Sequence, residues 1–76
     1  MAGPNGKRAR DAEASRRRLL EAGVKVFSER GPDGGSVSMI ARHARINRRM
    51  LYHYFGSKEG LYRAAFRHAY EQLSSA

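Results

Sequence analysis

The sequence predicts a small, all-helical fold, and three observations lead to this expectation. Apolar residues recur at i, i+3, i+4 and i+7 in several stretches of the 76-residue chain, which is the spacing of an amphipathic helix. No stretch shows the alternation of apolar and polar residues that is typical of a half-buried strand. Glycine, proline and small polar residues separate the helical stretches, as they do at helix ends. At this length the chain forms one small domain at most.

The first helix is predicted over residues 11–30. Its end is marked by Gly31, which can adopt the left-handed conformation that closes a helix, and by Pro32, which cannot continue one. Residues 1–10 consist mainly of Gly, Pro, Asn and basic residues with little to bury, so they predict a flexible basic arm. The apolar stripe of the helix comprises Leu19, Leu20, Gly23, Val24, Val26 and Phe27.

Two short helices are predicted next, after a loop over residues 31–35. Ser36 is a good N-cap for the first of them and Asn47 for the second, which runs over about 47–55 and stops at Gly56. The link of a few residues between two such short helices requires them to cross steeply, which is the helix-turn-helix arrangement. The second helix would then be the recognition helix. The inward face of the first short helix is formed by Val37, Ile40, Ala41 and Ala44.

A fourth helix is predicted after Ser57, which is again a good N-cap. The helix has one apolar side, and its last few residues are expected to fray. That side comprises Leu61, Tyr62, Ala65, Phe66, Ala69, Tyr70 and Leu73. From the whole chain, four residues are expected in the core without a functional role: Leu51, Phe55, Leu61 and Phe66.

The charge is concentrated rather than spread. Fifteen Lys and Arg against seven Asp and Glu give +8. The window 42–58 holds five of these basic residues and no acidic one, and the rest of the excess lies in residues 1–18. A localised basic patch is typical of nucleic-acid binding. The alternative is a solvated basic face that keeps the domain soluble.

The residues that several other classes of function require are missing from the sequence. Without cysteine there is no disulfide or thiolate zinc site, and the three scattered histidines do not predict a metal site. No run of about 18 apolar residues or signal peptide is present. The sequence shows no paired carboxylates, Ser-His-Asp or Cys-His set, or phosphate loop, so we expect no enzymatic activity and no cofactor. A cationic membrane-surface protein stays a weaker alternative, because the Gly and Pro breaks favour a compact fold.

The predicted recognition helix divides into two faces. Leu51 and Phe55, spaced i and i+4, point into the core. The outward residues are Arg48, Arg49, Tyr52 and His53. Arginine forks match guanine edges or phosphates, and a tyrosine hydroxyl suits a phosphate oxygen. Lys58 at the start of the fourth helix opposes the helix dipole, which is easier to explain if a phosphate docks beside it.

An ordered set of residues over about 16–61 also resembles the N-terminal DNA-binding domain of the TetR family of bacterial transcriptional regulators. The spacing Tyr-x-x-Phe-x-x-Lys-Glu-x-Leu at its end is specific. The matching residues are Arg16, Leu19, Leu20, Ala22, Val26, Phe27, Glu29, Gly31, Ser36, Val37, Ile40, Ala41, Ala44, Leu51, Tyr52, Phe55, Lys58, Glu59 and Leu61.

The resemblance implies a homeodomain-like bundle of three helices plus the start of a fourth, over residues 11–76. It implies sequence-specific binding of double-stranded operator DNA by a transcriptional regulator, a repressor in our expectation, with helix 47–55 in the major groove. The base contacts it implies are Ser38, Arg48, Arg49 and His53. The expected phosphate contacts are Ser36, Asn47, Tyr52, Lys58 and Arg45. Further candidates are Met50, Tyr54, Arg42 and Arg10.

Three positions depart from the family pattern. Arg45 stands where the turn residue is usually glycine, so a left-handed conformation there would cost about 1 kcal/mol. Arg49 replaces a common small residue, and Met50 replaces a small or polar one. These bulky residues mean that the operator sequence does not follow from relatives.

Some roles stay open from the sequence. Tyr52 is either a phosphate contact or a half-buried core residue, and Tyr54 belongs either to the core or to the DNA-facing side. Residues 16–18, all arginine, form either a solvated face or a phosphate contact. The basic residues of the arm, Lys7, Arg8 and Arg10, either reach a minor groove or stay in solvent.

The resemblance also implies partners beyond DNA. Full-length family members are homodimers whose larger C-terminal helical domain binds a small-molecule effector, and that domain is absent from this chain. We therefore expect the chain alone to be monomeric. A bacterial cytoplasmic, nucleoid-associated location is expected, with no membrane partner.

Overall fold

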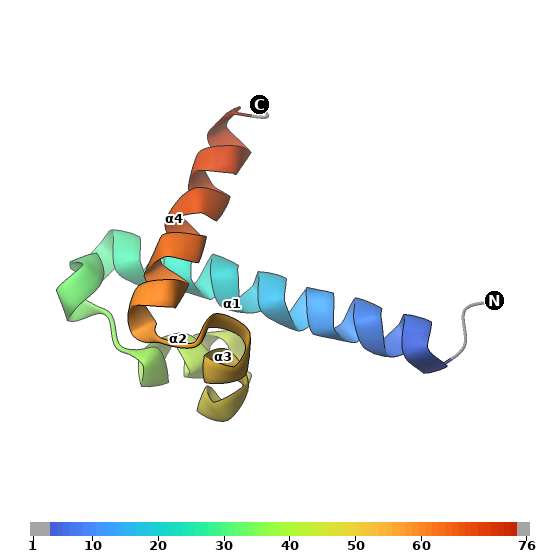
Figure 1. Cartoon of the computed structure of the whole chain (residues 1–76). Coiled ribbons are helices and arrows are strands. Elements are labelled where there is room, and N and C mark those ends of the chain that lie inside the picture. The colour runs from blue at the N-terminus through green and yellow to red at the C-terminus, as the bar shows by residue number, and fades with distance from the viewer. Residues whose placement is uncertain (1–3, 75–76) are drawn as a thin grey trace.

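The computed structural model describes the backbone of residues 4–74 and the side chains of residues 10–74, and it is all-α. The four helices are α1 (Pro4–Gly34), α2 (Val37–Ala44), α3 (Arg48–Phe55) and α4 (Lys58–Ser74). Helices α2 and α3 pack on the same side of α1, and α4 crosses α1 (Figure 1). The all-helical fold and the helix-turn-helix arrangement predicted from the sequence are confirmed.

Helix α1 begins earlier than the sequence predicts. It starts at Pro4 rather than near residue 11, so residues 4–10 of the arm that was expected to be flexible are helical, while residues 1–3 lie outside the described residues. Proline is favourable in the first turn of a helix because its missing N–H is not needed there. The Lys, Arg, Ala and Glu residues that follow are strong helix formers. The prediction gave too much weight to Gly and Pro and too little to these residues.

The break at Gly31 was predicted correctly. This glycine has φ 78° and ψ 170°, a positive φ that is strained for residues with a Cβ. Pro32 then opens a short helical turn that continues to Gly34, and the Gly35 amide donates to the Gly31 carbonyl at 3.2 Å. The expected loop over residues 31–35 therefore contains one more turn of helix.

Residues 45–47 link α2 to α3 through a Schellman motif. The Ile46 amide donates to the carbonyl of Ala41 at 3.0 Å, and the Arg45 amide donates to the carbonyl of Arg42 at 3.1 Å. Arg45 has φ 61° and ψ 43°, the left-handed conformation that this motif requires. The strained arginine expected in the turn is therefore present.

Glycine at this position should make the domain more stable than alanine does. Arg45→Gly and Arg45→Ala both remove the guanidinium, but only alanine keeps the Cβ that strains a left-handed residue. We expect the glycine variant to have a free energy of unfolding about 1 kcal/mol higher than the alanine variant, measured by urea denaturation. Equal stabilities would mean that residue 45 does not keep its left-handed conformation.

The three predicted N-caps are all present. The side-chain oxygen of Ser36 accepts from the Met39 amide at 3.1 Å, and that of Asn47 accepts from the Met50 amide at 2.9 Å. Ser57 accepts from the Gly60 amide at 2.9 Å. Each bond satisfies one of the amides that a helix start leaves without a partner.

One apolar core joins the four helices. The largest side chains that are fully buried in it are Leu19, Ile40, Leu51 and Leu61. Phe55, which was expected in the core, packs against it and is only partly buried. The other buried apolar residues are Leu20, Ala22, Val26, Phe27, Val37, Ala41, Ala44 and Ala65.

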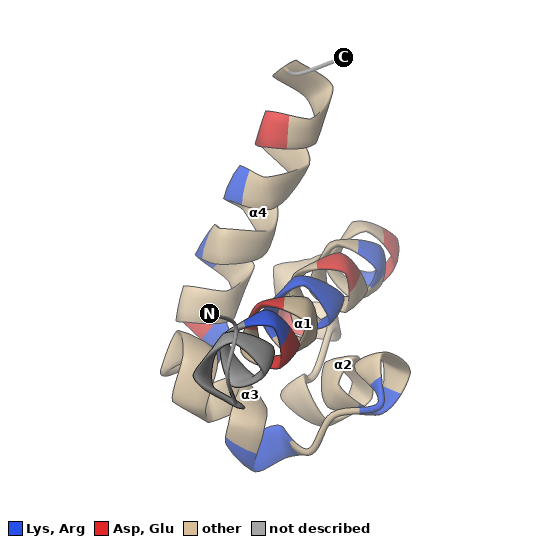
Figure 2. Ribbon diagram, turned by 90° about the vertical axis from the view of Figure 1, so that its right-hand side faces the viewer, with Lys and Arg blue, Asp and Glu red and all other residues tan. Residues whose placement is uncertain are grey.

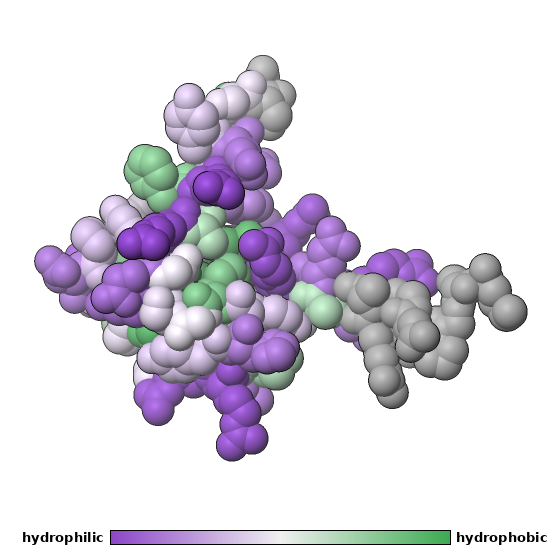
Figure 3. Space-filling model, viewed as in Figure 1, coloured by the Kyte–Doolittle hydropathy of each residue, from purple (hydrophilic) through white to green (hydrophobic). Residues whose placement is uncertain are grey.

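The C-terminal half of α4 corrects the sequence prediction. Phe66, expected in the core, is 65% exposed, and Tyr70 and Leu73 are exposed as well. Because α4 crosses α1 at an angle, its later turns move away from the bundle (Figure 1). Apolar atoms accordingly appear at the surface beside α4 in Figure 3.

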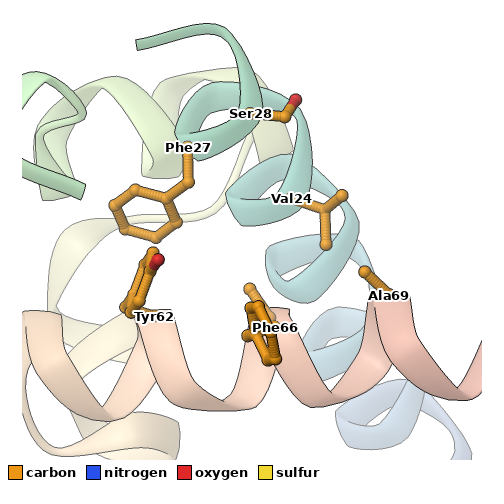
Figure 4. A pocket seen from close by; sticks show the side chains of 7 residues that line it. Val24, Phe27, Ser28, Tyr62, Phe66 and Ala69 are labelled. Carbon is orange, nitrogen blue, oxygen red and sulfur yellow. The ribbon is translucent and has the colours of Figure 1, made fainter. Parts of the chain in front are cut away.

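A shallow cavity of about 160 Å³ lies where α1 and α4 begin to separate. Phe66 and Tyr62 from α4 face Val24 and Phe27 from α1 across it (Figure 4). The rings of Phe27 and Tyr62 meet edge to face, with centroids 5.0 Å apart, and close its inner end. No helix within residues 4–74 is long and apolar enough to cross a membrane.

Candidate nucleic-acid interface

Nearly all the residues that the sequence predicts as DNA contacts are exposed, and most come from α2, α3 and the link between them. Those on α2 and its N-cap are Ser36, Ser38 and Arg42; those on the link and α3 are Arg45, Asn47, Arg48, Arg49, Met50, Tyr52 and His53. Lys58 and Tyr54 are partly buried, and Arg10 is exposed on α1. The fold therefore gathers this set, apart from Arg10, around the helix-turn-helix.

The first turn of α3 carries the concentrated charge. Lys and Arg positions mark the start of α3 and the end of α2 in Figure 2, at the end of the molecule away from the C-terminus of α4. Within the described residues, no carboxylate forms an ion pair with any basic side chain of the window 42–58. These cations are therefore available to a negatively charged partner.

Arg48 is held in place by α2. Its Nη1 donates to the Oγ of Ser38 at 2.9 Å, between two exposed side chains. The bond joins the first turn of α2 to the first turn of α3, so it fixes the guanidinium on the exposed side of both helices. Both residues were predicted as DNA contacts, but their bond to each other was missed, because ten positions separate them in the chain.

The N-cap residues keep hydrogen-bond donors free for a ligand. Ser36 Oγ accepts from the helix, which leaves its hydroxyl hydrogen, and Asn47 Oδ1 accepts likewise, which leaves its amide hydrogens. Both caps lie at helix N-termini, where partial positive charge favours phosphate. Each cap can therefore support its helix and donate to a phosphate oxygen at once.

Tyr52 and Lys58 are the two predicted phosphate contacts nearest the junction of α3 and α4. Tyr52 is 44% exposed, and its side chain forms no hydrogen bond with the described residues, so its hydroxyl is available to a partner. Lys58 is the first residue of α4 and is partly buried. A cation there is disfavoured by the helix dipole, so an anion beside it would relieve the repulsion.

Met50 and Tyr54, two of the further candidates from the sequence, differ in their exposure. Met50 is 36% exposed and lies on the outer side of α3. Tyr54 is partly buried against the core, where its ring meets those of His53 and Phe55 at centroid distances of 5.5 and 6.4 Å. Met50 is therefore exposed beside the basic first turn of α3, whereas Tyr54 packs against the core.

Residues 10–74 contain no cluster of side chains suited to a metal ion. No three of their His, Asp and Glu side chains come together in a way that could hold a metal ion. What the surface does present is a short exposed helix with a basic first turn, fixed across a tight turn to a second short helix. This is the arrangement of a helix-turn-helix DNA-binding domain.

Comparison with known proteins agrees with this class. The family model described as bacterial regulatory proteins of the tetR family matches residues 19–65, more than half of the chain. The chain therefore belongs to the TetR family of helix-turn-helix transcriptional regulators, and DNA binding follows from that membership. No solved structure matches it.

Curated relatives share the same region. The transcriptional repressor NicS of Pseudomonas putida is 44% identical over 71 residues, 93% of this chain and 34% of NicS. The repressor SCO4008 of Streptomyces coelicolor is 41% identical over 71% of this chain and 28% of its own length. The regulator BetI of Burkholderia cenocepacia is 36% identical over 84% and 33%. The chain thus spans about a third of the length of these relatives.

Proposed function

We propose that this chain is the part of a transcriptional repressor that binds a specific double-stranded operator, with α3 in the major groove. The observation that carries the proposal is the basic first turn of α3, exposed and without carboxylate partners in the described residues. An α-helix fits the major groove, where base edges differ between all four base pairs. The repressor role rests on the similarity to the transcriptional repressors NicS and SCO4008.

Within this proposal the residues divide into two groups. The first group contacts base edges. It comprises Arg49, His53 and Arg48, which Ser38 holds in place, and Met50 adds an apolar contact beside them. The second group fixes the position of the domain on the phosphates. It comprises Ser36, Asn47, Tyr52, Lys58 and Arg45, with Arg42 and Arg10 as further contacts.

We also propose that the protein acts as a dimer in the bacterial cytoplasm, on the nucleoid, with a small-molecule effector bound outside these 76 residues. Two copies would present their α3 helices to half-sites about 34–36 Å apart, one helical turn of DNA. A single copy would contact one half-site and bind weakly. The 76-residue chain alone is expected to be a monomer. Sedimentation without DNA tests this, and a stable dimer of the isolated chain would contradict the expectation.

Selection of bound duplexes from a random DNA pool at defined salt tests the function. Enrichment of a half-site or a palindrome is the expected result. Strong, salt-sensitive binding without enrichment would indicate a non-specific binder. Binding to anionic vesicles without binding to duplex DNA would favour the membrane-surface alternative instead.

Arg49→Ala should relax specificity at one base pair. Arg49 has no partner within the described residues, so its fork is free to contact a guanine edge, and its loss should remove about 1–3 kcal/mol of discrimination. The measurement is the affinity for the selected duplex and for variants that differ at single base pairs.

Lys58→Ala is the matched control for this prediction. It also removes one positive charge, but from a proposed phosphate contact, so all duplexes should weaken alike and the salt slope should fall by about one. If Arg49→Ala also weakened every duplex equally, its base-contacting role would be wrong.

A further inference from the structure

Arg18 connects the middle of α1 to the end of α2. Its Nη2 donates to the carbonyl oxygen of Ala44, the last residue of α2, in a partly buried bond between residues 26 positions apart. The sequence left this arginine either in solvent or on a DNA phosphate. In the structure its guanidinium contacts the protein instead.

The carbonyl that Arg18 contacts is one that the turn itself does not satisfy. The last carbonyls of a helix have no partner within it. The Schellman bonds of Arg45 and Ile46 serve the carbonyls of Arg42 and Ala41, which leaves the Ala44 carbonyl. A cation is also favoured at this negative end of the helix dipole, and hydrogen bonds from charged donors are the stronger ones.

Arg16 makes a parallel contact with α3. Its guanidinium carbon lies 5.4 Å from the centre of the Phe55 ring, a cation–π distance, and Phe55 is the last residue of α3. One short stretch of α1 therefore contacts the C-terminal ends of both helices. Arg17, between the two, makes no hydrogen bond, ion pair or ring contact within the described residues.

The two helices that these arginines hold are themselves joined at two places. The Schellman turn leads directly into Asn47, the N-cap of α3, and the Arg48–Ser38 bond connects their first turns. A shift of the Ala44 end of α2 is therefore transmitted to α3. Because base contacts depend on placement to within a fraction of an ångström, such a shift would affect specific binding first.

We propose that Arg18, assisted by Arg16, is a positioning residue: it holds the α2–α3 unit against α1 in the orientation that specific binding requires, and it does not itself contact DNA. The proposal rests on the proposed operator binding. It predicts a loss confined to specific binding, because non-specific binding depends on total charge rather than on the exact placement of α3.

The test compares Arg18→Met with Arg17→Met. Both variants lose one positive charge from the same turn of α1 and keep an unbranched stem, but only the first loses a protein contact. Affinities are measured for the selected duplex and for an unrelated duplex over a series of salt concentrations. Relative to Arg17→Met, we expect Arg18→Met to bind the selected duplex about tenfold more weakly. The affinity for the unrelated duplex and the salt slope should be the same for both variants.

Three results of these binding measurements would overturn the proposal. A salt slope lower by about one in Arg18→Met than in Arg17→Met would show a phosphate contact. Equal affinities of the two variants for the selected duplex would show that the Ala44 bond does not matter. Equal weakening on both duplexes, matched by an unfolded fraction in circular dichroism, would show a role in stability alone. If Arg18→Met does not fold, Arg16→Met provides the same comparison at the end of α3.

Amide hydrogen exchange without DNA separates this proposal from the proposed function. Arg18→Met should speed exchange at Ile46, in the turn beside Ala44, about tenfold relative to Arg17→Met, and unchanged exchange would overturn the positioning role. If wild-type protein shows no preference for any duplex, operator binding fails independently of this result.

Discussion

Replacing Leu51 by alanine is expected to destabilise the domain strongly, by about 2–5 kcal/mol. Leu51 is fully buried on the inner side of α3, nearly opposite to Arg49 around the helix. Alanine there would remove apolar contacts and leave a cavity at the point where α3 joins the core. A domain of 76 residues has a total stability of roughly 4–11 kcal/mol, so the variant would lose a large share of its stability.

Urea denaturation followed by circular dichroism measures this effect, and Met50→Ala is the matched control. Met50 precedes Leu51 on the same helix but is partly exposed, so its truncation should change stability by only about 0.5 kcal/mol. DNA binding should fall in the Leu51 variant in proportion to its unfolded fraction. Equal stabilities of the two variants would contradict the inward orientation of Leu51.

The features that sequence reasoning predicted well are those that depend on a few neighbouring residues. The N-caps at Ser36 and Asn47 and the breaks at Gly31 and Gly56 each follow from where the backbone can place its hydrogen bonds. The left-handed Arg45 is also a local feature, but it was expected from the family resemblance, in which glycine usually stands at this turn position. These constraints act within about one helical turn.

One prediction failed because it depends on a distant part of the chain. The apolar stripe on α4 shows which residues can be buried, but it does not show where the crossing helix α1 stops covering them. Phe66 was therefore predicted to lie in the core, whereas the structure exposes it. The early start of α1 had a different cause. The Gly and Pro of the first residues were given more weight than the helix formers that follow, although proline suits a first turn.

The candidate site shows the same division. The i, i+4 spacing of Leu51 and Phe55 was enough to separate the inner from the outer face of α3. It could not show that Ser38 holds Arg48, or that Arg18 holds Ala44, because both bonds join side chains to groups on another helix. The same spacing does not decide whether Met50 and Tyr54 point inward or outward, because both lie at the edge between the two faces of α3.

Gly60→Ala should destabilise the domain, although alanine is ordinarily the better residue inside a helix. A Cβ at Gly60, in the first turn of α4, would lie 2.3 Å from the carbonyl oxygen of Phe55. That atom belongs to the backbone at the end of α3 and cannot move without displacing the turn between the two helices. We expect a loss of about 3 kcal/mol, the upper end of the usual cost of overpacking, together with weaker operator binding.

Gly23→Ala is the contrasting control, because this buried glycine also lies at the contact between α1 and α4. A Cβ there would meet the Ala65 Cβ at 3.4 Å and the Leu61 Cδ1 at 3.5 Å, which are ordinary contact distances. Alanine should therefore raise stability by about 0.5–1 kcal/mol, its usual advantage over glycine in a helix. Opposite signs for the two substitutions in urea denaturation are the expected result. A stabilising Gly60→Ala would mean that the α3–α4 turn can open, so that the position of α3 does not depend on this close approach.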